Sequence, residues 1–153
     1  MTLAMVHPFD ITLLDMLKAY ATELGLHYDP AFAEDAQLCH MFRNDDGAIV
    51  GFVRGRSIKS LCTYRIESIY VRPEYRQKGY GTAMLTKLFK VLSTGAWGYN
   101  QAPDSIDFFP PSANIAAVRL AQKAGFLDIY VGLRRSLCLQ FQCVNSLVVS
   151  CRN

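Results

Sequence analysis

Residues 66–92 read IESIYVRPEYRQKGYGTAMLTKLFKVL, and this stretch changes from a strand-like to a helical pattern. Residues 64–71 (YRIESIYV) are rich in β-branched and aromatic side chains, which favour a strand. Pro73 and the glycines at 79 and 81 then interrupt regular structure. The stretch therefore predicts a strand, a glycine-rich turn and an amphipathic helix that packs on a sheet. The apolar residues at helical spacing are Leu85, Leu88, Phe89 and Leu92.

The glycine-rich turn, RQKGYG at residues 76–81, is the strongest chemical signal in the chain. Glycines let backbone N–H groups approach a ligand, and the first turn of the following helix adds N–H groups without intrahelical partners. Such a site prefers an anion, typically phosphate, and Arg76 and Lys78 add positive charge beside it. The chain has no G-x-x-x-x-G-K-[ST], and Met84 replaces the third glycine of G-x-G-x-x-G. Nucleoside triphosphates and nicotinamide or flavin dinucleotides are therefore disfavoured.

The rest of the chain alternates helical and strand-like patterns, which predicts an α/β domain with a mixed sheet. Asp10 is expected to cap a helix that ends at Gly25, and a weaker helix is predicted after Pro30. Residues 38–57 form a predicted hairpin around the turn Asp45-Asp46-Gly47. Residues 144–153 receive no assignment. The remaining predictions are a strand at 105–109, a helix capped by Asn114 or Ser112 and ended by Gly125, and strands at 127–133 and 137–143.

Size and composition predict a single soluble domain. The 153 residues suit one compact unit, so residues 1–153 are expected to form one domain. No apolar run reaches the length of a membrane-spanning helix and no secretory signal pattern opens the chain, so we expect a cytoplasmic protein without membrane contact. The net charge is a mild +3 and the chain has no run of five or six like charges, so nucleic-acid binding is not indicated. Five cysteines without C-x-x-C spacing and three scattered histidines predict neither a disulfide framework nor a metal site.

Two motifs together resemble the GNAT superfamily of acyl-CoA N-acyltransferases. The first is YVRPEYRQKGYGTAML at residues 70–85. The second is NIAAVRLAQKAGF at residues 114–126, which is similar to the family's N-x-x-A-x-x-F-Y-x-x-x-G-F helix. The resemblance covers residues 38–133. It implies a single GNAT-like domain in which helices flank a mixed, mostly antiparallel sheet, and it implies acetyl-CoA as the acyl-donor cosubstrate.

The resemblance also implies binding roles for individual residues. The pyrophosphate of acetyl-CoA would lie on main-chain N–H groups of the glycine loop. The preceding strand would pair through its main chain with the pantetheine arm and hold the thioester carbonyl. Asn114 corresponds to a family position that contacts the cofactor arm, although it could equally serve only as a helix cap. The expected acetyl-CoA-binding residues are Ile69, Tyr70, Val71, Arg76, Gln77, Lys78, Gly79, Tyr80, Gly81, Thr82 and Asn114.

Transfer to an amine requires a neutral amine, and some family members that acetylate small amines carry a glutamate base at the position of Glu67. The resemblance therefore implies that Glu67 is the catalytic base, directly or through water. Strand alternation is expected to place its side chain on the same sheet face as Ile69. A purely structural ion pair of Glu67 with Arg54 or Arg65 is the alternative interpretation.

The chain departs from the family at the tyrosine that is presumed to protonate the leaving thiolate, because that position is Ala121. Tyr70, Tyr99, Tyr130 and Ser112 are candidates to replace the tyrosine. Otherwise the thiolate leaves unassisted or takes a proton from water, which a thiol pKa of about 8.5 permits.

The sequence thus predicts an N-acetyltransferase that transfers an acetyl group from acetyl-CoA directly to an amine of a small molecule or a protein. The alternative is a non-catalytic acyl-CoA-binding or interaction module that kept the fold without the acid tyrosine. A phospholigand-binding domain unrelated to coenzyme A is a more distant possibility. The aromatic loop with Trp97 and Tyr99 either lines a substrate pocket or packs as a satellite cluster. We expect a monomer or a homodimer, since the apolar tail offers an edge strand to a second subunit.

Overall fold

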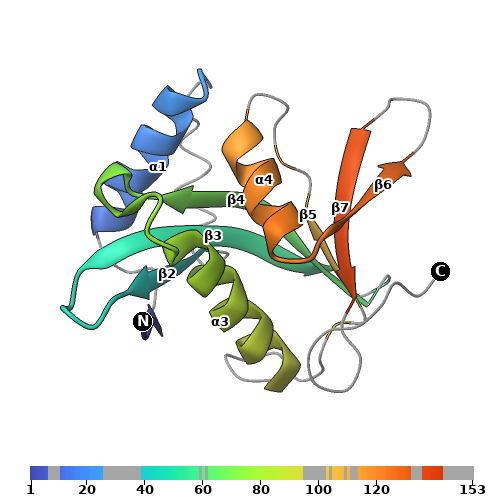
Figure 1. The fold of residues 1–153 in the computed structure, drawn as a ribbon, viewed down its shortest axis with the longest axis horizontal. Coiled ribbons are helices and arrows are strands. Elements are labelled where there is room, and N and C mark those ends of the chain that lie inside the picture. The colour runs from blue at the N-terminus through green and yellow to red at the C-terminus, as the bar shows by residue number, and fades with distance from the viewer. Residues whose placement is uncertain are drawn as a thin grey trace.

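The computed structural model describes residues 1–6, 11–25, 39–58, 60, 62–94, 103, 105–108, 110, 114–131 and 136–142. Within these residues a seven-stranded sheet has the order β1-β2-β3-β4-β5-β7-β6 (Figure 1). Neighbouring strands are antiparallel except β4 and β5, so the prediction of a mixed, mostly antiparallel sheet is confirmed. The strands are β1 (Ala4–Val6), β2 (Cys39–Arg43), β3 (Ile49–Ile58), β4 (Thr63–Val71), β5 (Ser105–Phe108), β6 (Leu127–Val131) and β7 (Ser136–Gln142). The helices are α1 (Ile11–Glu23), the short 3-10 helix η3 (Pro73–Tyr75), α3 (Tyr80–Thr94) and α4 (Ile115–Lys123).

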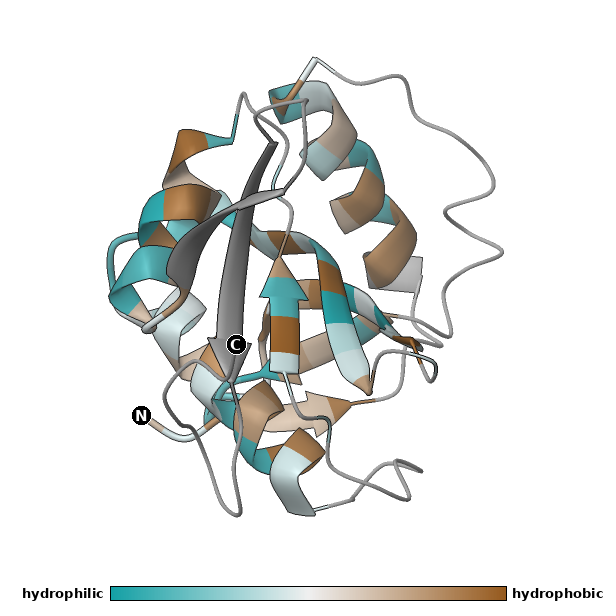
Figure 2. Cartoon of the chain, turned by 90° about the vertical axis from the view of Figure 1, so that its right-hand side faces the viewer, coloured by the Kyte–Doolittle hydropathy of each residue, from teal (hydrophilic) through white to brown (hydrophobic). Residues whose placement is uncertain are grey.

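The helices cover both faces of the sheet, as the view in Figure 2 shows. Helices α3 and α4 bury one apolar face in a core that includes Leu88, Ala121 and Ile69. Helix α1 lies on the opposite face, where it packs against Phe52 and Tyr70. No helix of the described stretches is long and apolar enough to cross a membrane.

The sheet opens along β4, and this opening positions the functional site. Strand β5 pairs with β4 from Thr63↔Ser105 to Ile66↔Phe108, where the side chains of Thr63 and Ser105 also hydrogen bond at 2.8 Å. Residues 67–71 have no strand partner on this side among the described residues. In the described part of the chain, the parallel pairing of the two strands thus gives way to a free edge of β4 after Ile66.

A bulge in β4 coincides with the opening. In the pairing with β3, Arg54 faces Ser68 while Gly55 faces Ile66, which leaves Glu67 as the extra residue. An extra residue shifts side-chain alternation by one position. Ile66 and Ile69 therefore lie in the same core under α3 and α4, although they are three positions apart.

The elements predicted around the glycine turn are confirmed. Helix α3 begins at Tyr80, two residues before the expected start at Thr82. Asn114, rather than Ser112, provides the observed cap of α4, because its Oδ1 atom accepts a hydrogen bond from the N–H of Ala117 at 3.1 Å. Ser112 lies outside the described residues. The strands predicted at 127–133 and 137–143 correspond to β6 and β7, with ends shifted by one or two residues.

The N-terminal half differs from the expectation at one strand. The hairpin of β2 and β3 is confirmed, and Gly47 takes a φ of +84° in its turn. Strand β1 was not predicted, because three residues are too short to show a period, and it pairs with β2 at the edge of the sheet. The helix expected after Pro30, the loop with Trp97 and residues 144–153 lie outside the described residues.

Candidate functional site

The turn between β4 and α3 presents backbone N–H groups to solvent-accessible space. Gln77 and Gly79 have positive φ angles of 59° and 84°. The first hydrogen bond of α3 runs from the N–H of Ala83 to the carbonyl oxygen of Gly79 at 3.1 Å. The N–H groups of residues 80–82 therefore precede the helical ladder. Since a helix N-terminus also carries partial positive charge, this turn favours an anion.

Gly81 brings the first turn of α3 against α4. A Cβ atom at this position would lie 2.9 Å from Cδ2 and 3.1 Å from Cδ1 of Leu120. Real Cβ atoms do not approach that closely, so the glycine permits the contact. The two sequence motifs thus meet in space through Gly81 and Leu120.

A cavity of about 580 Å³ lies between the glycine turn, the free half of β4, α4 and the last turns of α1. Its walls contain ten of the eleven predicted acetyl-CoA-binding residues, and the exception is Lys78. The lining residues are Tyr20, Glu23, Leu24, Ile69, Tyr70, Val71, Tyr75, Arg76, Gln77, Gly79, Tyr80, Gly81, Thr82, Asn114, Ala116, Ala117, Leu120 and Lys123.

The free edge of β4 directs main-chain groups of alternate residues into this cavity. The N–H of Arg72 donates to the carbonyl oxygen of Val50 at 2.9 Å, on the side of β3. Because hydrogen-bonding directions alternate along a strand, the main-chain groups of Tyr70 also face β3, while those of Ile69 and Val71 face the free edge. The carbonyl oxygen of Val71 accordingly accepts a hydrogen bond at 2.8 Å from Nε of Arg76, on the cavity side. The arrangement offers an extended ligand main-chain groups beside an anion site.

Residues 9–126 match the Acetyltransferase (GNAT) family. The chain belongs to this family. GNAT members use acetyl-CoA, and this chain is a GNAT-family acetyltransferase. No curated protein matches the sequence.

Solved structures share the fold at low sequence identity. GCN5 of Tetrahymena has a TM-score of 0.69 at 11% identity, over 96% of this chain and 99% of that one. The PaiA N-acetyltransferase of Thermoplasma acidophilum, in complex with coenzyme A, gives 0.67 at 14% identity, over 94% and 100% of the two chains. The diaminobutyrate acetyltransferase EctA of Paenibacillus lautus gives 0.62 at 17% identity, over 91% and 92%. These similarities establish the GNAT fold.

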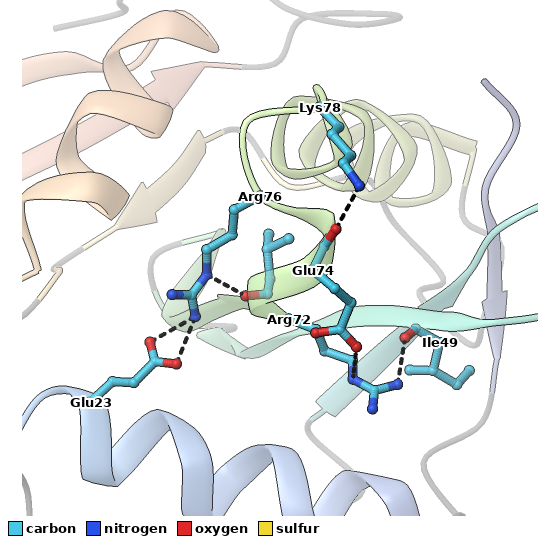
Figure 3. Close-up of polar contacts among 7 residues, drawn as sticks. Glu23, Ile49, Arg72, Glu74, Arg76 and Lys78 are labelled. Carbon is cyan, nitrogen blue, oxygen red and sulfur yellow. Dashed lines mark hydrogen bonds and ion pairs between the residues drawn. The ribbon is translucent and has the colours of Figure 1, made fainter.

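The positive charges of the GNAT glycine turn already have partners (Figure 3). Nη2 of Arg76 lies 2.7 and 2.8 Å from the two carboxylate oxygens of Glu23. Lys78 turns away from the cavity lining, and its Nζ atom donates to the carbonyl oxygen of Glu74 at 2.7 Å. Of the two charges that the sequence placed beside the anion site, only that of Arg76 lines the cavity.

Glu67 forms ion pairs on the α1 side of the sheet. Its carboxylate lies 3.0 Å from Nη1 of Arg54 and 2.6 Å from Nε of Arg56. The alternative pairing with Arg54 is therefore present, whereas Arg65 pairs instead with Asp107 at 3.7 Å. Glu67 is not part of the cavity lining.

The expectation that Glu67 and Ile69 share a sheet face was wrong. Simple alternation fails here because Glu67 is the extra residue of the bulge. Ile69 packs in the core beneath α3 and α4, while Glu67 points to the β3 arginines on the other face.

Asn114 caps α4, which confirms one of the two roles that the sequence left open. It also lines the cavity, and its contact with the cofactor arm stays a prediction. Ala121 is fully buried and not part of the lining. Among the candidates to replace its missing hydroxyl, Tyr70 lines the cavity. Tyr99 and Ser112 lie outside the described residues, and Tyr130 is described only as part of β6.

Four polar residues of the lining were missed by sequence reasoning, namely Tyr20, Glu23, Tyr75 and Lys123. The ring of Tyr20 packs in the core with the apolar residues of α1. The first two belong to α1, which is remote in sequence from both motifs. Lys123 stands nine residues after Asn114 in the second motif, and its charge was the one local signal that could have indicated the cavity.

Proposed function

We propose that this chain transfers the acetyl group of acetyl-CoA directly to the amine of a second substrate. The observation that carries the proposal is that one cavity is lined by a helix N-terminus and by a stretch of β4 that no described strand pairs on this side. A strand edge pairs with the amides of an extended ligand, and a helix N-terminus binds phosphate. Acetyl-CoA has both features, in its pantetheine arm and its pyrophosphate. A volume of about 580 Å³ is also typical of a ligand pocket.

In this proposal the pyrophosphate lies on the main-chain N–H groups of residues 77–82. The pantetheine amides pair with the main chain of Ile69 and with the N–H of Val71, since Arg76 already occupies the carbonyl oxygen of Val71. Arg76 and Lys123 supply positive charge to the cavity wall, from the turn and from α4. Asn114 contacts the same arm while it caps its helix.

Glu67 is the proposed base for the amine. A carboxylate has about four acceptor positions, of which the arginine contacts use two, so it can still accept a proton from a bound water. Because Glu67 stands outside the cavity lining, we propose that this water connects it to the amine. The pairing with Arg54 and Arg56 fixes the carboxylate beside the bulge, where β4 becomes free.

Calorimetric titration of the full chain with acetyl-CoA tests the binding step. We expect saturable binding of acetyl-CoA and much weaker binding of inorganic pyrophosphate. Absence of acetyl-CoA binding would overturn the proposal, and equal binding of the two would indicate a phospholigand domain unrelated to coenzyme A.

Release of coenzyme A over a panel of amines tests the transfer step. The panel contains a polyamine, an aminoglycoside, a lysine peptide and a peptide with a free α-amine. We expect acetylation of at least one class. Tight binding of acetyl-CoA without turnover over the whole panel would favour the non-catalytic module.

A further inference from the structure

Helix α1 places a tyrosine on the wall of the cavity. Tyr20 lines the cavity and is only 5% exposed. Its ring makes edge contacts with the rings of Phe52 and Tyr70, at centroid distances of 6.0 and 6.3 Å. These contacts hold the ring on the sheet, so its hydroxyl has a fixed place in the site.

The hydroxyl of Tyr20 lies where the cavity meets the bulge of β4. It is within hydrogen-bonding reach of the side chains of Ser68 and Asn114. Ser68 is the first residue after the bulge, and Asn114 precedes α4. The amide oxygen of Asn114 accepts from the N–H of Ala117, and its NH₂ group is available to donate to the oxygen of Tyr20. Tyr20 thus connects the two walls of the cavity beyond the point where β5 pairing stops.

The ring of Tyr70 contacts that of Tyr20, but the hydroxyl of Tyr70 and the residues Tyr75 and Tyr80 belong to the phosphate-binding end of the lining. The charges that act on the hydroxyl of Tyr70 are those of Glu23, Arg76, Glu74 and Arg72, all at or beside the glycine turn. Tyr75 and Tyr80 belong to that turn and contact each other edge to face at 5.4 Å. Tyr20 is therefore the described tyrosine placed where the thioester would lie if the pyrophosphate occupied the turn.

We propose that the hydroxyl of Tyr20 donates a hydrogen bond to the sulfur of coenzyme A as it leaves, an inference that rests on the proposed acetyl transfer. A fixed donor aimed at developing negative charge stabilises that charge without reorganisation. Burial raises the pKa of Tyr20 above its ordinary value of 10.0 and outweighs the lowering by Ser68, Asn114 and Arg54. The hydroxyl consequently keeps its proton at neutral pH, as a donor must.

The bonds and protons of this step balance without a further reactant. The amine nitrogen forms a bond to the acetyl carbon, the carbon–sulfur bond breaks, and its electron pair goes to sulfur. The proton of the amine goes to water and from there to Glu67. Tyr20 keeps its own proton, because a thiol with a pKa of about 8.5 is a stronger acid than a buried phenol.

The protonation of bound coenzyme A tests the inference without knowledge of the acceptor. The full chain is loaded with coenzyme A, and thiolate formation is followed by ultraviolet absorbance against the complex with desulfo-coenzyme A. We expect the pKa of the bound thiol to be lower in the wild type than in Tyr20→Phe by about 1 unit, since a hydrogen bond to the charged form favours it. Tyr64→Phe is the matched control, because Tyr64 is a buried tyrosine of β4 outside the lining, and its complex should titrate like the wild type.

Turnover with the best amine of the panel gives a second measurement. Tyr20→Phe is expected to lower kcat about 100-fold, as removal of one preorganised donor does, while the Kd of acetyl-CoA changes less than about twofold. A loss of acetyl-CoA affinity equal to the loss of kcat would indicate a structural role and overturn the inference.

The outcomes separate the two proposals. If the wild type does not bind coenzyme A, the proposed function fails and the role of Tyr20 fails with it. If it binds and the thiol titrates identically in the wild type and in Tyr20→Phe, only the role of Tyr20 is overturned. If Tyr20→Phe does not fold, the NMR chemical shift of the Cζ atom of Tyr20 in the wild type shows whether its hydroxyl senses the thiolate. This chemical shift should change with the thiol titration in the coenzyme A complex and should stay constant in the desulfo-coenzyme A complex. A chemical shift that does not change with the thiol titration overturns the inference.

Discussion

Comparison of Gly79→Ala with Gly47→Ala distinguishes an effect of backbone strain on stability from an effect on acetyl-CoA binding. Gly79 has a φ of +84°, and the nearest atom to an added Cβ is Cε of Met1 at 3.9 Å, so a methyl group fits while the backbone is strained. Gly47, in the turn between β2 and β3, has the same φ and no atom within 4 Å of an added Cβ. Both replacements therefore carry nearly the same cost of a left-handed conformation, about 1–2 kcal/mol.

Urea denaturation measures that shared cost. The free energy of unfolding should fall by similar amounts in Gly79→Ala and Gly47→Ala, because neither methyl group meets a close neighbour. Calorimetry with acetyl-CoA should then distinguish them. Alanine keeps its own N–H group, but relief of the strain is expected to shift the turn and withdraw one main-chain N–H group from the phosphate. Loss of such a hydrogen bond costs about 1.5–3 kcal/mol, so the Kd should rise at least about tenfold in Gly79→Ala. Gly47→Ala should keep the wild-type Kd, since its turn is not part of the cavity lining.

Equal acetyl-CoA affinity of the two variants would refute the placement of the pyrophosphate on residues 77–82. A much larger loss of stability in Gly79→Ala than in Gly47→Ala would refute the premise that strain is matched. The reduced affinity would then reflect a damaged turn rather than a lost contact.

Three further replacements test charges around the cavity. Glu67→Gln should lower turnover about 100-fold at an unchanged Kd of acetyl-CoA, because an amide does not accept the amine proton, and steady-state kinetics with unchanged turnover at neutral pH would exclude the base role. Glu23→Gln should tighten acetyl-CoA binding about threefold in calorimetry by removing a negative charge from the wall, whereas Glu74→Gln, outside the lining, should have a smaller effect on the Kd. Lys123→Ala should weaken binding about threefold and make the Kd less sensitive to salt, and an unaltered salt dependence would remove Lys123 from the phosphate contacts.

The sequence predicted those parts of the site that a continuous segment determines. The strand, the glycine turn and α3 follow one another within 27 residues, so period and turn chemistry are sufficient to identify them. The cap at Asn114 follows in the same way, because a cap bonds within its own first turn. Ten of the predicted binding residues surround one cavity for this reason.

The parts that the sequence did not predict depend on packing between remote segments. Tyr20 has the spacing of a core residue of α1, and nothing near it in the chain shows that α1 ends beside the glycine turn. The pairing of Arg76 with Glu23 joins positions 53 residues apart. Lys78 has the charge expected of a phosphate ligand, but a carbonyl oxygen four residues away holds its amine outside the lining.

The bulge at Glu67 shows why an extra residue in β4 matters for the site. Pairing with β5 ends at Ile66, the residue before the extra one, and bulges increase the local twist of a strand. Were alternation continuous, Ile69 would lie on the α1 face and Tyr70 in the core beneath α3 and α4. The shift instead buries Ile69 beneath those helices and turns Ser68 towards Tyr20. One extra residue thus accompanies the free edge and also arranges hydroxyl groups beside it, so the edge and the proposed thiolate donor depend on the same local irregularity.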